Sequence, residues 1–236
     1  MKHYSYGFIF SFVLPKHWFW FSDPYDIENA AMVNFFSYNK IDKNGFFRRD
    51  GITSVIDLTQ NLDVIWSKMR EGFVRDQIQK GERRGIEIKR DNNFKDFKKI
   101  YEEFREAKLL PKDNFNVFEK QGLLFNAYYQ GSVIASGLFI SDGESIRAWV
   151  LASLHYSNDG KMRETVGQAN RILIWEAIKY ARETGHKIFD LGGTGIQSLA
   201  QFKEGFGGDR RECYYYYKVY SPLLKLWMRL RGFKNI

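Results

Sequence analysis

Residues 170–208 constrain the fold of this chain more than any other part of it. They read NRILIWEAIKYARETG, then HKIFDLGG and, after a short loop, LAQFKEGFGG. Apolar residues between positions 174 and 181 recur at helical spacing, and Gly185 stands where a helix commonly ends. The apolar stretch 187–191 has the length of a buried strand. This segment therefore predicts an α/β protein in which an amphipathic helix leads into a buried strand.

A carboxylate and two glycines stand at the end of that predicted strand. Asp190 stands just before the flexible pair Gly192 and Gly193. The carboxyl ends of strands are where α/β proteins commonly bind ligands. Two roles are open for Asp190: its carboxylate takes part in catalysis, or it caps the turn that follows.

The rest of the chain alternates between helical and strand-like patterns. Turn residues at 130–131 and 141–144 join three strands as hairpins. The tyrosine run 214–217 is predicted as an edge strand with alternating faces. In full, we predict strands at 52–59, 86–89, 123–129, 132–140 and 145–153, helices at 62–81, 94–110 and 113–122, and a polar loop at 154–167.

Several of these motifs together resemble the Fem-type peptidyl and aminoacyl transferases and their shorter acetyltransferase-like relatives in the GNAT superfamily. The motifs are ANRILIWEAIKYARETGHKIFDLGG and LAQFKEGFGG, preceded by ITSVIDLT, IWSKMREGFVRDQIQKGERRGIEI and GSVIASGLFI. The resemblance covers 52–217, and the pairing of FDLGG with FKEGFGG is its most specific part. It implies a GNAT-like α/β fold: a mixed, mainly antiparallel sheet with helices on both faces. It also implies transfer of an acyl or aminoacyl group to a primary amine.

The resemblance also implies catalytic residues. Lys203, in the FK pair, matches the Fem-type lysine thought to stabilise negative charge on the reacting carbonyl; the alternative is an exposed helix lysine. Phe202 would pack beneath it. One tyrosine of the run 214–217, with Tyr216 as our choice, is expected to protonate the leaving group, as tyrosines do in many GNAT enzymes. Glu164 and Glu204 compete with Asp190 as the base.

A donor-binding loop is expected before the signature helix. Free backbone amides at a helix N-terminus cradle phosphate groups. In most GNAT enzymes this loop reads Gln or Arg, x, x, Gly, x, Gly or Ala. Here one extra residue separates Arg163 from Gly167, and this departure argues against conventional coenzyme A binding. We predict Arg163, Gly167, Gln168 and Asn170 as donor-binding residues, with an ordinary surface loop and helix start as the alternative.

A basic helix upstream is the expected acceptor site. Arg75, Lys80 and Arg83, together with Phe202, are predicted to face an anionic acceptor, since the planar fork of arginine suits phosphate. Asp76 and further acids interleave with the basic residues, so a solvated helix face is the alternative.

Composition narrows the class of partner. The formal charge of +8 and the pI near 9.4 favour anionic partners. Cys213 is the single cysteine, which excludes a disulfide framework and a Cys-rich metal site, and the four histidines lack metal-ligand spacing. We predict no metal and no tightly bound cofactor.

Two donors and a non-enzymatic alternative follow from these observations. Acyl-CoA is favoured as co-substrate by the brevity of the chain, and aminoacyl-tRNA by its basic surface. The acceptor is expected to be an anionic, cell-envelope-related small molecule or sugar, and DNA is not an expected partner. The third reading is a non-catalytic GNAT-like domain that binds an anionic ligand.

The chain divides into three predicted parts. Residues 1–50 form an aromatic-rich extension packing on the main domain, 51–221 form the transferase domain, and 222–236 form a basic amphipathic tail. The tail either docks on its own domain or contacts an anionic membrane. The apolar run 6–14 is too short to span a bilayer and lacks a cleavage signal. We therefore expect a cytoplasmic protein, with peripheral attachment to a membrane as the alternative.

Overall fold

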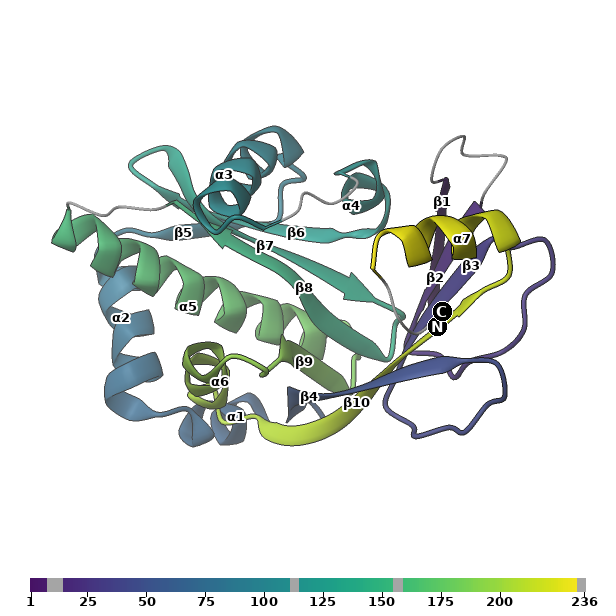
Figure 1. Ribbon diagram of the computed structural model, residues 1–236. Coiled ribbons are helices and arrows are strands. Elements are labelled where there is room, and N and C mark those ends of the chain that lie inside the picture. The colour runs from purple at the N-terminus through teal and green to yellow at the C-terminus, as the bar shows by residue number, and fades with distance from the viewer. Residues whose placement is uncertain (8–14, 111–114, 155–158, 233–236) are drawn as a thin grey trace. The chain divides into compact units, whose positions relative to one another are not determined.

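The computed structural model describes residues 1–7, 15–110, 115–154 and 159–232 (Figure 1). They form two compact units. Unit 1 contains Met1–Thr53, Gly193–Gly195 and Arg210–Ile236, and unit 2 contains Ser54–Gly192 and Ile196–Asp209. The predicted segments 1–50 and 222–236 therefore both fall in unit 1, while 51–221 is divided between the two units.

The sheet of unit 2 is mixed and mainly antiparallel, as the resemblance implies. Its strands follow the order β4 (Phe47–Asp57, which enters the unit at Ser54), β9 (Ile188–Gly193), β8 (Ser145–Ser153), β7 (Ser132–Ser141), β6 (Leu123–Tyr129) and β5 (Glu87–Lys89). From β5 to β8, each strand pairs antiparallel with the next one in the chain, and β8 pairs parallel with β9. The predicted turn between β6 and β7 is confirmed, since Gln130 and Gly131 both have the positive φ of a two-residue hairpin, 50° and 76°.

Helices cover both faces of this sheet, as Figure 1 shows. One face carries α3 (Phe94–Ala107) and α4 (Phe115–Gln121). The other carries α5 (Gly160–Glu183), with α1 (Leu62–Lys68), a π-helix η1 (Glu71–Arg75), α2 (Asp76–Arg83) and α6 (Gln197–Glu204). Alternation along β7 serves both layers: Leu138 packs with the α3 and α4 cluster, and Phe139 packs with the α5 cluster.

The predicted single helix 62–81 is wrong, because the chain breaks in its middle. Met69 and Arg70 are extended, with ψ of 137° and 121°. The backbone N–H of Arg70 donates to the carbonyl of Gly205, at 2.8 Å. At this point a tertiary hydrogen bond replaces the hydrogen bonds of the helix. The helical segment that follows the break is the π-helix η1.

The predicted polar loop 154–167 is also wrong in its second half. Helix α5 begins at Gly160, where the Asp159 side chain accepts a hydrogen bond from the Met162 N–H at 3.0 Å. Val166 and Ala169 are buried in the core. An aspartate cap and buried apolar positions therefore extend the helix over the residues predicted as a loop.

Unit 1 is built from both ends of the chain. Its strands follow the order β1 (Lys2–Gly7), β2 (Pro15–Trp20), β3 (Met32–Ser37), β10 (Asp209–Val219) and the first part of β4. The predicted edge position of the tyrosine run is wrong, because β10 lies between β3 and β4. Helix α7 (Pro222–Leu230) packs Leu224 and Met228 against Ala31 and Val219. Across the described ranges, none of the helices has both the length and the apolar character needed to cross a bilayer.

Candidate active site

A buried polar cluster lies where β8, β9 and α6 meet in unit 2. It contains Arg147, Asp190 and Lys203, whose exposed fractions are 4%, 0% and 9%. Arg147 and Asp190 are directly paired in the parallel β8–β9 register, so their side chains share one face of the sheet, and they form a buried ion pair. Lys203 comes from the last turn of α6. The cluster thus unites residues far apart in the sequence.

Both carboxylate oxygens of Asp190 are engaged. Oδ2 accepts a hydrogen bond from Nη1 of Arg147, and Oδ1 accepts one from the Gly192 N–H at 2.7 Å. This is the turn-capping role that the sequence left open for Asp190. A carboxylate held in this way orients Arg147 and the β9 turn, and we assign it a positioning role.

Gly192 lets Lys203 approach the strand end. Its φ is +87°, and a Cβ built on it would lie only 3.1 Å from Nζ of Lys203 and 3.3 Å from the Ala148 carbonyl oxygen. A side chain at this position would meet both the backbone strain and the ammonium group. The glycine of the FDLGG motif therefore holds open the space that Lys203 occupies.

The environment lowers the pKa of Lys203 to about 8, first because burial disfavours the charged ammonium and then because Arg147 repels it, while Asp190 opposes the shift. The ammonium therefore titrates near pH 8, and it is largely removed from bulk water. A cation in such a place interacts strongly with charge that develops beside it. The predicted alternative of an exposed helix lysine does not describe this side chain.

Lys203 and its neighbour Phe202 face different surroundings. Phe202 is half-buried, lies 5.5 Å from the Phe206 ring centroid, and has the Arg171 guanidinium 5.2 Å from its own ring centroid. The short helix α6 therefore borders both the buried cluster and a second feature around Arg171.

That second feature is a cleft of about 280 Å³ between η1, α2 and α5, which we call the arginine cleft. Arg171 donates from Nε to the Phe73 carbonyl at 2.6 Å and from Nη1 to the Gly167 carbonyl at 2.8 Å. The guanidinium also lies 4.6 Å from the Phe73 ring centroid. The residues that line the cleft are Gly72, Phe73, Gln77, Arg163, Glu164, Gly167 and Arg171.

The predicted donor-binding residues lie inside α5 rather than in a loop before it. Arg163 and Gly167 line the arginine cleft. Gln168 is buried, and its Nε2 donates to Gln77 at 3.2 Å and to Glu164 at 3.1 Å. Asn170 donates to the Val166 carbonyl of its own helix at 3.1 Å. Their amides belong to the helical ladder, so the expected phosphate-cradling loop is absent from these described residues.

Of the predicted acceptor residues, Phe202 lies beside Arg171, but the three basic ones do not converge on either feature. Arg75 is half-buried, and its guanidinium lies 3.5 Å from the Glu71 carboxylate on the same helical segment. Lys80 and Arg83 are exposed on α2. Neither they nor Arg75 line the arginine cleft. Lys80 and Arg83 thus have the surroundings of a solvated helix face, whereas Arg75 is partly buried.

Tyr216 lies in unit 1, where its hydroxyl makes two hydrogen bonds to backbone groups. Its hydroxyl donates to the Asn39 carbonyl at 2.9 Å and accepts from the Ile41 N–H at 2.7 Å. Burial raises the pKa of this phenol. Its hydroxyl thus fastens the 39–41 segment to β10.

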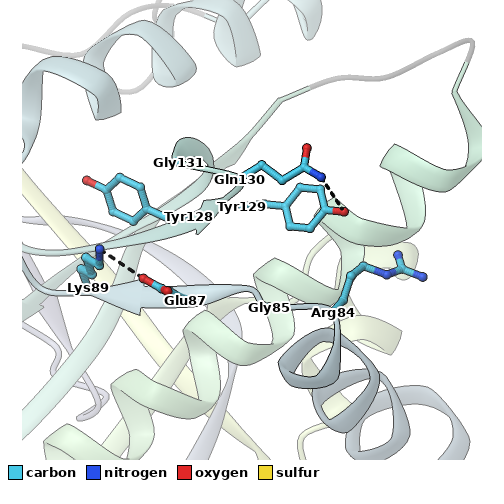
Figure 2. A pocket seen from close by; sticks show the side chains of 8 residues that line it. All are labelled: Arg84, Gly85, Glu87, Lys89, Tyr128, Tyr129, Gln130 and Gly131. Atoms are coloured by element: carbon cyan, nitrogen blue, oxygen red, sulfur yellow. Dashed lines mark hydrogen bonds and ion pairs between the residues drawn. The ribbon is translucent and has the colours of Figure 1, made fainter.

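A pocket of about 500 Å³ lies at the other edge of the unit 2 sheet (Figure 2). Figure 2 shows Tyr128 and Tyr129 beside the short strand β5, where Lys89 pairs with Glu87 at 3.2 Å. Arg84 is bound to Glu164, at 3.1 Å, on α5. The cations of this pocket already have carboxylate partners, and none of the predicted site residues lines it.

Arg147 and Arg171 are the residues that sequence reasoning missed. Arg147 interrupts an otherwise apolar strand, SIRAWVLAS, and a charged residue there signals a buried partner. Arg171 stands four residues after Gly167 on the same helix face. Arg171 reaches the Phe73 carbonyl because the chain breaks at Met69, and no sequence pattern indicated that break. Within the described ranges, no group of three or more histidine, cysteine or acidic side chains is placed to hold a metal ion.

Comparison with known proteins identifies the fold. No family model and no curated protein sequence matches this chain. FemX resembles it with a TM-score of 0.62 at 15% identity, over 84% of this chain and 75% of FemX. The C-terminal domain of a putative lysylphosphatidylglycerol synthetase from Agrobacterium fabrum gives 0.54 at 12% identity, over 85% and 72%. L-PGS from Bacillus licheniformis gives 0.52 at 15%, over 85% and 72%. The chain therefore has the fold of FemX and of lysylphosphatidylglycerol synthetase, as the resemblance predicted.

Replacing Lys203 by methionine should leave the fold intact and raise its stability at pH 7. Since the Lys203 pKa falls from 10.5 to about 8, the native state holds its charged form at a cost of up to about 3 kcal/mol. Between pH 8 and 10.5 the folded protein releases this proton while the unfolded chain keeps it, so wild-type stability rises with pH there. The advantage of the variant should therefore shrink toward pH 10.5 in urea titrations.

Asp190→Asn is the contrasting variant. It should destabilise the protein by about 3–5 kcal/mol, because it leaves the charge of Arg147 buried with a weakened partner. A loss of more than about 2 kcal/mol in Lys203→Met at pH 7 would show that the lysine is structural.

Proposed function

We propose that this protein is an acyltransferase that moves an acyl group from an activated ester or thioester to a primary amine on an anionic acceptor. The observation that carries the proposal is the buried Lys203 ammonium held beside Arg147 at the end of β9. The fold shared with FemX and with the lysylphosphatidylglycerol synthetase domain supports it, because both names denote proteins of this architecture and the second denotes aminoacyl transfer to an anionic lipid.

The proposed reaction is a nucleophilic acyl substitution. The neutral amine attacks the carbonyl carbon of the donor and forms the new C–N bond, and the carbonyl oxygen becomes an oxyanion. When the tetrahedral species collapses, the bond to the donor sulfur or oxygen breaks, and the proton lost by the amine leaves with that thiol or hydroxyl group. Lys203 would act by stabilising the oxyanion with a charge that is already in place, an effect of about 10²–10³ in rate for comparable donors.

Two acyl donors are candidates for this reaction. The first candidate is a thioester of coenzyme A. A second candidate, an aminoacyl-tRNA ester, is favoured by a specific observation: α5 begins at Gly160, so Arg163, Gly167 and Gln168 provide no loop of free amides for a diphosphate. The formal charge of +8 also suits a polyanionic donor.

The role of Lys203 predicts a pH profile. Only the protonated ammonium stabilises an oxyanion, so kcat/KM expressed for the neutral form of the acceptor amine should fall about tenfold for each pH unit above about 8. Lys203→Met should lose about 10²–10³ in kcat. Lys203→Arg, which stays protonated, should keep part of the activity and lose the alkaline decline.

A kcat/KM for the neutral amine that instead rises through pH 8 would mean that Lys203 acts as the base, which contradicts the proposed role. Full activity of Lys203→Met would end the proposal. Lys99→Met, which removes one exposed positive charge from α3, is the matched control and should behave as wild type.

The donor can be identified with two parallel assays. Thiol release from a panel of acyl-CoAs is measured with amine acceptors, and label transfer is measured from charged tRNA. The only cysteine, Cys213, is buried in unit 1 and should add little background to a thiol reagent. Thiol release that depends on Lys203 supports the thioester, and transfer from tRNA that depends on Lys203 supports the ester. A wild-type protein that binds anionic ligands but turns over neither donor would instead be a binding module.

A further inference from the structure

We infer that the arginine cleft binds a phosphate or diphosphate group, with Arg171 as its principal ligand. The guanidinium groups of Arg163 and Arg171 line this small space, and that of Arg70 lies over the Phe73 ring at its border. None of the three has a carboxylate partner among the residues that the structure describes. The inference rests on the proposed function only in assigning that group to a substrate of the transferase.

Arg171 is a half-buried cation held by neutral groups. Its two hydrogen bonds go to backbone carbonyls of Phe73 and Gly167, and its flat faces lie against the rings of Phe73 and Phe202. Burial and the nearby charge of Arg70 lower its pKa. Carbonyl dipoles and aromatic rings orient a guanidinium but do not neutralise it, so an anion that enters the cleft gains a strong charge-assisted hydrogen bond.

Two further arginines reinforce this field. The Arg70 guanidinium lies 4.0 Å from the Phe73 ring centroid, so Phe73 contacts both Arg70 and Arg171. Arg163 lines the cleft from α5. The acid that lines the cleft, Glu164, is already bound to Arg84 at 3.1 Å. The balance of charge around the cleft is therefore positive.

Spacing along α5 shapes the cleft. Arg163, Gly167 and Arg171 stand at i, i+4 and i+8, which places them on one helix face. Gly167 has no side chain, so the space between the two arginines stays open. An added Cβ there would meet Nη1 of Arg171 at 3.5 Å, an ordinary contact, so alanine fits while a large side chain fills the cleft.

The size of the cleft limits what it binds. Its volume of about 280 Å³ is just below the roughly 300–1,000 Å³ of pockets that enclose whole small molecules. A charged head group fits this space better than a complete cofactor. The break at Met69, which produces η1, is what places Phe73 and Gly72 opposite α5.

Inorganic diphosphate is the probe for the test. Wild-type protein should bind it in calorimetric titrations, with affinity that falls as salt is added. Arg171→Met should weaken binding about tenfold or more, Arg163→Met should weaken it less, and Gly167→Leu should abolish it by filling the cleft. Lys99→Met is the control and should bind as wild type.

The outcomes separate this inference from the proposed function. Undiminished diphosphate binding in both Arg171→Met and Gly167→Leu would overturn the cleft assignment, and Gly167→Leu keeps the test decisive if Arg171→Met fails to fold. Lys203→Met should bind diphosphate normally while it loses transfer. Transfer retained in Lys203→Met would end the proposed function and leave the cleft assignment standing.

A second inference concerns α7 in unit 1, and a different observation carries it. The face with Leu224 and Met228 is buried, but Leu223, Leu226 and Leu230 are 64%, 57% and 80% exposed. Their i, i+3 and i+7 spacing makes them one apolar stripe.

Basic residues border this stripe. Lys225 is half-exposed, Arg229 and Arg231 are exposed, and no acid occurs in 222–232. We propose that the stripe docks on an anionic lipid surface, because leucines then enter the interface while the flanking cations meet lipid phosphates. A second copy of the chain suits the surface less well, since a two-fold contact would bring the same cations together.

Flotation with vesicles tests this docking. Wild-type protein should bind vesicles of phosphatidylcholine with phosphatidylglycerol, and bind pure phosphatidylcholine about tenfold less. Serine at Leu223, Leu226 and Leu230 together should abolish binding, whereas serine at the exposed Val64, Leu109 and Leu110 of unit 2 should not. Wild-type protein that stays unbound, or a serine variant that still floats, would overturn the proposal, as would a dimer that dissociates only in the serine variant.

Discussion

The buried ion pair between Arg147 and Asp190 is the interaction on which the candidate site depends. It joins the two parallel strands β8 and β9 at one register position, and the second oxygen of Asp190 binds the Gly192 N–H and so holds the turn. A buried pair of this kind is weak evidence for stability, because desolvation offsets the attraction. Its effect is to fix geometry: Lys203 meets a defined strand end with its pKa lowered to about 8.

Helix α6 connects that geometry to the arginine cleft. Successive residues on a helix point in directions about 100° apart, so Lys203 faces the buried pair while Phe202 lies against Arg171. A reacting carbonyl near the ammonium and an anionic group near Arg171 would thus be held by one rigid element. The same helix carries the hydrogen bond from Arg70 to Gly205 just beyond its end, which ties the break at Met69 to the site.

Local patterns predicted most of the unit 2 elements because their causes are local. The hairpin strands β6 and β8 have the predicted bounds, since Gln130 and Gly131 take the turn geometry that their residue types favour. The start of α5 and the break at Met69 were missed for opposite reasons. Asp159 is a local cap that the polar pattern hid, whereas the break follows from a hydrogen bond to Gly205, more than a hundred residues away.

The sequence by itself determined the strand, turn and helix that carry Asp190 and Lys203, because the FDLGG and FKEGFGG motifs contain their own local signals. Only the tertiary structure decided what surrounds them. Periodicity reports which face of an element is apolar, but it does not report which distant side chain meets that face. Arg147 and Arg171 acquire their roles through strand pairing and through a chain break, and both depend on contacts between residues far apart in the sequence.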